Sequence, residues 1–66
     1  MTGALLARHI EDIADNLRDA AAAAQAAQNL VVEAKHSAAL ELLIETMLPL
    51  QEALTTIRLV VIQAAT

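Results

Sequence analysis

The sequence predicts an all-α fold, an antiparallel two-helix hairpin that dimerises into a four-helix bundle. Two observations predict it. Apolar residues recur at alternating steps of three and four in each half of the chain, and the two halves are out of phase. Such spacing is typical of helices that pack against other helices. The chain would form one domain, 1–66, with a helix over about 3–34, a turn over about 35–37 and a second helix over about 38–64.

The first half of the chain carries an apolar seam on a largely polar helix. Thr2 is the predicted N-cap, because its hydroxyl can accept a hydrogen bond from an amide of the first turn. The seam then crosses the alanine-rich run 20–27, whose small side chains would let a neighbouring helix approach closely. The members of this first seam are Leu6, Ile10, Ile13, Leu17, Ala20, Ala24, Ala27, Val31 and Ala34.

The turn is predicted from the conflict between the two seams. Continued beyond Ala34, the first seam would bury the carboxylate of Glu41, so its phase fails there. The chain therefore breaks its helix between Ala34 and Leu40, and Ser37 is the best N-cap for the second helix. Asn29 is the alternative position for the turn, since Asn tolerates the left-handed conformation found at helix ends.

The second half carries the strongest pattern in the chain. Its apolar phase passes unchanged through Pro49, which predicts a kink at that residue; a helix that ends before Pro49 and restarts there is the alternative. The β-branched residues of segment 55–62 would also suit a strand, but the helical phase persists to the end. The members of this second seam are Leu40, Leu43, Met47, Leu50, Leu54, Ile57, Val61 and Ala64.

Apolar residues also lie off the second seam. Hydrophobic residues make up 58% of the chain, more than a lone two-helix hairpin can bury, so a second neighbour is expected. We expect the core of the assembly to contain Leu43, Met47, Leu50, Leu54, Ile57 and Val61. We expect the interface or partner-binding residues to be Ile44, Leu48, Leu59, Val60 and Ile62.

Charge and hydropathy disfavour two classes of partner. The net charge is −4, with only four Lys and Arg, and phosphate neutralisation supplies most of the affinity for nucleic acid, so no nucleic acid partner is expected. The longest uncharged run, 20–32, is shorter than the roughly 20 residues that span a bilayer. The amino terminus lacks the apolar region of a secretory signal. We therefore expect a cytoplasmic protein that does not bind membranes.

Few residues are spaced for chemistry. Glu33 and His36 have the Glu-x-x-His spacing that di-iron bundles use in pairs, but they fall at the predicted turn, and we interpret them as polar residues of a helix end. His9 and Glu11 do not share a helical face. The only glycine is Gly3, which excludes a glycine-rich phosphate loop. We expect no enzymatic activity, no metal and no cofactor.

The predicted function is a non-enzymatic protein–protein interaction module. It would be a small helical homodimer that acts as an adaptor, a chaperone or an inhibitor or regulator of a partner protein, which docks on an apolar helix face. The same apolar excess is compatible with a higher oligomer. The alternatives are a metal- or small-ligand-binding bundle and a nucleic-acid-binding regulatory hairpin of the plasmid or phage type. The chain resembles such plasmid regulators in its two-helix plan alone.

Overall fold

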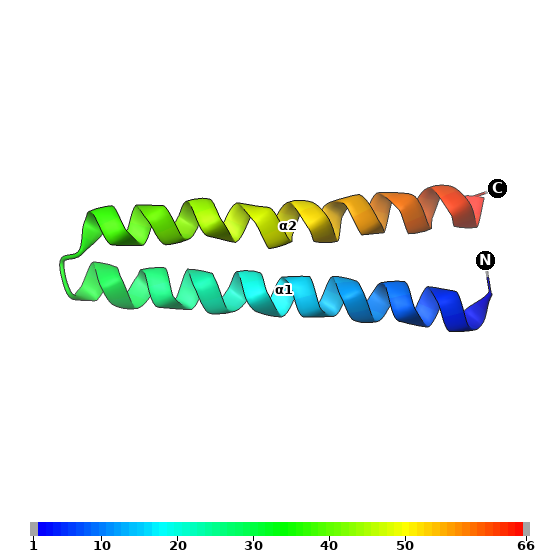
Figure 1. Cartoon of the computed structure of the whole chain (residues 1–66), viewed down its shortest axis with the longest axis horizontal. Helices are drawn as coiled ribbons and strands as arrows, with labels where there is room; N and C mark the ends of the chain where they lie inside the picture. The colour runs from blue at the N-terminus through cyan, green and yellow to red at the C-terminus, as the bar shows by residue number, and fades with distance from the viewer. Residues whose placement is uncertain (1, 66) are drawn as a thin grey trace.

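The computed structural model describes residues 2–65 and is a pair of long antiparallel helices joined by a short turn (Figure 1). Helix α1 spans Gly3–Val32 and helix α2 spans His36–Ala65. The helices contact each other along their length, and the two ends of the chain lie at the same end of the hairpin. The Cα atoms extend over 49 × 16 × 11 Å. The predicted all-α hairpin is thus confirmed.

Helix α1 begins as the sequence predicts. Thr2 has an extended backbone (φ −77°, ψ 156°), and its Oγ1 accepts a hydrogen bond from the Leu5 amide at 3.2 Å. The Thr2 carbonyl accepts the first helical bond, from the Leu6 amide, at 3.0 Å. The bond from the Leu5 amide satisfies a donor of the first turn that has no partner inside the helix. The prediction of Thr2 as the N-cap is confirmed.

The turn occupies residues 33–35, two residues earlier than predicted. The amide of Ala34 donates to the Val31 carbonyl at 2.9 Å, and the amide of Lys35 donates to the Leu30 carbonyl at 2.8 Å. Ala34 has a positive φ of 62°. These bonds and this conformation define a Schellman motif, the common way to end a helix, except that glycine usually occupies the left-handed position.

Both residues proposed from the sequence to mark this region lie inside helices. Ser37, the expected N-cap, is within α2, whose first backbone bond runs from the Ala39 amide to the Lys35 carbonyl at 3.0 Å. Asn29, the alternative turn, is within α1, and its carbonyl accepts from the Glu33 amide at 3.2 Å. The chain bends at a residue whose side chain carries no signal for a turn.

Ala34→Gly is expected to stabilise the hairpin. A left-handed alanine costs roughly 1–2 kcal/mol, whereas the added freedom of glycine in the unfolded chain costs roughly 0.4–1 kcal/mol, which leaves a net gain of up to roughly 1.5 kcal/mol. Urea unfolding followed by circular dichroism measures it as a higher midpoint at unchanged slope. Ala22→Gly, at an exposed position inside α1, is the matched control and should lower the midpoint. A midpoint that falls in both variants would contradict the left-handed turn.

The two helices meet along a contact line of residues that are buried or half-buried. Both halves of this line step through the chain by three and four residues, as expected of a coiled-coil seam. Alanine dominates its buried positions, with Ala20 and Ala27 of α1 at 4% exposure and Ala53 of α2 at 2%. The contact line consists of His9, Ile13, Asn16, Ala20, Ala23, Ala27 and Leu30 in α1, and Ala39, Leu42, Thr46, Pro49, Ala53, Thr56 and Val60 in α2.

The two threonines of the contact line satisfy their own hydrogen bonds. Thr46 is buried, and its hydroxyl donates to the Leu42 carbonyl one turn back at 2.8 Å. The half-buried Thr56 does the same to Glu52 at 3.1 Å. Because each hydroxyl bonds within its own helix, neither needs a partner on α1. Thr46 and Thr56 therefore act as small packing residues.

Helix α2 runs through Pro49 without a break, so the alternative of two shorter helices is not adopted. Proline has no backbone N–H, so the Glu45 carbonyl lacks the hydrogen bond that residue 49 would otherwise donate to it. The ring is half-buried on the contact line and borders the same hollow as Ala23 of α1. The alanine-rich run of α1 thus lies where α2 carries its proline. The kink at Pro49 stays a prediction.

The two apolar seams found in the sequence do not pack against each other within the hairpin. The second seam does not face α1, because each of its members through Val61 follows a contact-line residue by one position and is exposed. The first seam is divided: Ile13, Ala20 and Ala27 lie on the contact line, whereas Ile10 and Leu17 are exposed. One residue turns a helix by about 100°, so the large side chains of α2 point to the side of the hairpin.

Candidate protein-interaction surface

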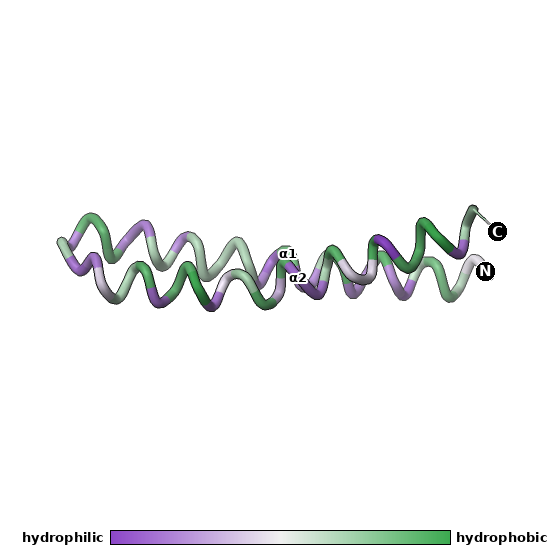
Figure 2. The backbone as a smooth tube through the Cα atoms, turned by 90° about the horizontal axis from the view of Figure 1, so that it is seen from above, coloured by the Kyte–Doolittle hydropathy of each residue, from purple (hydrophilic) through white to green (hydrophobic). Residues whose placement is uncertain are grey.

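The contact line divides the hairpin into two broad sides of opposite character. On each helix, the residue after a contact position lies about 100° round in one direction, and the residue before it about 100° round in the other. Because α1 and α2 are antiparallel, the residues that follow contact positions fall on the same side of the hairpin for both helices. Figure 2 colours the backbone by hydropathy and shows hydrophobic and hydrophilic residues interspersed along both helices.

The side formed by residues that follow contact positions is an uncharged apolar face. Its large side chains are exposed, from 39% for Ile57 to 61% for Leu40 and Val61. On this face, α2 contributes two adjacent rows of large side chains along its length, and α1 contributes one row. The apolar face consists of Ile10, Leu17 and Val31 of α1, and Leu40, Leu43, Met47, Leu50, Leu54, Ile57 and Val61 of α2.

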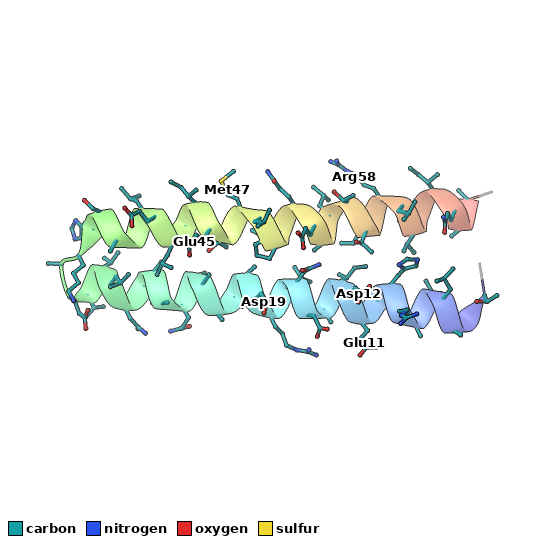
Figure 3. All side chains as sticks on the ribbon, in the orientation of Figure 1. Glu11, Asp12, Asp19, Glu45, Met47 and Arg58 are labelled. Carbon is teal, nitrogen blue, oxygen red and sulfur yellow. The ribbon has the colours of Figure 1, made fainter. Side chains whose placement is uncertain are left out.

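The opposite side is an acidic groove. Two adjoining open hollows lie along it, of about 570 and 320 Å³, and both are bordered by side chains from α1 and α2. Figure 3 shows Glu45 of α2 between the two helices and Asp12 and Asp19 over the ribbon of α1, whereas Glu11 points away from α2. The carboxylates of the groove are Asp12, Asp15, Asp19, Glu45 and Glu52.

The acidic groove is weakly neutralised. Arg18 Nη1 lies 2.7 Å from Asp15 Oδ1, but both side chains are exposed, so the pair contributes little stability. Five of the eight carboxylates of the chain border this groove, and the apolar face has none. The hairpin therefore has one side that favours contact with water and one that does not.

The total exposed surface is large for a chain of this size. It amounts to 4932 Å², whereas a compact monomer of 7.0 kDa exposes about 4000 Å². The excess of roughly 900 Å² is similar to the approximately 800 Å² that each partner buries in a standard protein–protein interface. The hairpin alone thus leaves uncovered about as much surface as one such interface removes from water.

The residues predicted for the partner interface are dispersed by the fold. Ile44 is exposed on the side of α2 away from α1, and Leu48 borders both hollows of the acidic groove. Leu59 and Ile62 are exposed but do not belong to the apolar face. Val60 is half-buried on the contact line and packs within the hairpin.

Sequence reasoning assigned the apolar face itself to packing between helices, as the second seam. The signal that distinguishes face from contact line is the line of mostly smaller residues that precedes the members of the seam through Val61, such as Thr46 before Met47 and Ala53 before Leu54. Those smaller residues keep a step of three and four of their own. Figure 3 shows Met47 pointing away from α1.

The titratable pairs considered from the sequence are not gathered into a site. Glu33 lies in the turn and His36 at the start of α2, both exposed, and Glu33 Oε2 is 3.5 Å from Lys35 Nζ. His9 is half-buried on the contact line, while Glu11 is on the outer side of α1. Within residues 2–65, no three His, Cys, Asp or Glu side chains are grouped as a metal site would require.

No helix in the described part of the chain has the length and hydropathy needed to cross a membrane. Comparison with known proteins finds no family model, no curated protein and no solved structure that matches this chain. The two sides of the hairpin are therefore the basis on which a function can be proposed.

Proposed function

We propose that this protein is a non-enzymatic protein–protein interaction module that works as a small helical homodimer through its apolar face. The observation that carries the proposal is the exposed, uncharged face of large side chains on a hairpin whose own core is mostly alanine. Residues such as Leu50 and Leu54 contribute little to the hairpin, because they are about half exposed within it. Their burial requires a second molecule.

The free energy of burial favours association strongly. Covering apolar surface stabilises by about 25 cal/mol per Å², and a small hairpin has little other stability to rely on. The hairpin buries chiefly small side chains, which contribute less than buried leucine or isoleucine. Four helices packed around the apolar faces of two copies would form the large-residue core that one hairpin lacks.

The role of such a module is to present helices to other proteins. Outside the dimer contact, exposed apolar residues such as Ile44, Leu59 and Ile62 would remain for helical partners, which dock by side chains spaced three and four residues apart. The proposed classes of activity are those of an adaptor, a chaperone or a regulator that inhibits its partner by occupying a groove. The acidic groove would remain in water and keep the assembly dispersed.

Size-exclusion chromatography with light scattering tests the proposal on the full chain. We expect a mass near twice the 7.0 kDa of one chain at micromolar concentration. We also expect a melting temperature that rises with protein concentration, because dissociation accompanies unfolding. A monodisperse, fully helical monomer with a concentration-independent melting temperature would contradict the proposal.

A further inference from the structure

The geometry points to one arrangement of that dimer, in which α2 packs antiparallel against α2 of the second copy. The contact runs along the second seam, the stripe of residues from Leu40 to Ala64. This inference rests on the proposed function, since it presupposes that the apolar face binds a second copy. It adds which helices pair, in which direction and around which residues. Leu50 and Leu54 would lie nearest the two-fold axis.

The spacing of the stripe is self-complementary in the antiparallel direction. From Leu40 the steps along α2 are 3, 4, 3, 4, 3, 4 and 3, a series that reads the same in either direction. Two copies laid antiparallel therefore bring every member of the stripe level with another member. Leu50 lies opposite Leu54 of the second copy, and Leu43 lies opposite Val61. A two-fold axis requires this kind of self-complementarity.

Helix α1 offers a poorer partner for this stripe. On α1, the row of residues that borders the apolar face has one member at every seventh position: Ile10, Leu17, Ala24 and Val31. The positions beside that row are occupied by Ala14, Ala21 and Gln28, none of which supplies an apolar side chain large enough to fill the spaces between leucines. A stripe with steps of three and four packs best against another of the same period. The second copy of α2 supplies it.

The distribution of charge agrees with the same arrangement. The carboxylates of α2 are Glu41, Glu45 and Glu52, and none belongs to the stripe. Gln51 and Arg58 are the polar residues nearest its outer edge. When two apolar faces meet, both acidic grooves point outward on opposite sides, so their like charges are kept apart. No carboxylate has to be buried, which would be costly.

Cross-linking of single cysteines tests the arrangement cleanly, because the chain has no cysteine of its own. Each variant of the full chain is first shown by light scattering to be dimeric and is then treated with a short bismaleimide. We expect Leu50→Cys to form a covalent dimer in high yield. Leu43→Cys alone should not, because two antiparallel Leu43 positions lie 18 residues apart along the axis, about 27 Å.

A mixture of Leu43→Cys and Val61→Cys should cross-link after the copies exchange, whereas Thr55→Cys on the acidic side should not. Cross-linking of Leu43→Cys with itself would show parallel helices and overturn the inference while the dimer stands. Absence of a Leu50→Cys product in a dimeric sample would exclude α2–α2 pairing. A monomeric wild-type chain would instead overturn the proposed function, so the two failures are distinguishable.

Discussion

Leu54→Asp is expected to dissociate the proposed dimer. The side chain lies in the middle of the apolar face and is 46% exposed in the single hairpin, so the hairpin itself accommodates the change. In a two-fold dimer the substitution occurs twice. Each copy loses about 1.5–3 kcal/mol of apolar burial and also places a charge in an apolar contact. The dissociation constant should rise about a thousandfold or more, since every 1.4 kcal/mol is tenfold.

Thr55→Asp is the matched control, because it adds the same charge one residue further along α2. Thr55 borders the acidic groove, and its hydroxyl bonds to the Gln51 carbonyl at 2.9 Å. We expect this variant to stay dimeric by light scattering, with little loss of helix by circular dichroism. If Thr55→Asp dissociates the protein and Leu54→Asp does not, the interface lies on the acidic side and the proposal fails.

The plan of the fold could be predicted from the sequence because it depends on local signals. Two runs with helical period and a conflict between their phases indicate two helices and a break, which the hairpin confirms. Thr2 carries the chemistry of an N-cap in its own side chain. The excess of apolar residues on α2 likewise predicted exposed leucine and isoleucine, as found.

The register of packing could not be read from the size of the apolar residues. A stripe of leucine, isoleucine and methionine shows that a face is buried somewhere, but not which neighbour covers it. The line that meets α1 runs through Thr46, Pro49 and Ala53, which are smaller or less hydrophobic than leucine. Close packing of two helices favours small residues, whereas the larger ones suit a wider interface. Helix α2 therefore carries two lines of residues side by side, the contact line against α1 and the second seam on the apolar face.

The position of the turn was missed by two residues for a different reason. Helices usually end with glycine in the left-handed position, and alanine gives no such signal. Ala34 adopts the conformation because the Schellman bonds and the packing of both helices outweigh its cost. The phases of the two seams nevertheless indicate a break nearby, because they depend on the helices on either side and not on the turn itself.

The contact line itself makes the second large prediction: Ala20→Leu should destabilise the hairpin, whereas Ala24→Leu should not. Ala20 is 4% exposed, and a leucine there must push the helices apart, at a cost of about 1–3 kcal/mol. Ala24 is exposed in the row of α1 that borders the apolar face, where a leucine would enlarge that face. Leucine and alanine have similar helix propensities, so the contrast reports packing.

Thermal unfolding at one fixed protein concentration measures the contrast. At about 4–8 °C per kcal/mol for a chain of this size, Ala20→Leu should lower the melting temperature by roughly 4–24 °C. Ala24→Leu should keep or raise it, and light scattering should find its dimer at least as tight, because leucine adds apolar area where the second copy would bind. The same side-chain change, one helical turn apart, then acts with opposite sign. Equal losses in the two variants would mean that α1 meets α2 through a broader face than the contact line.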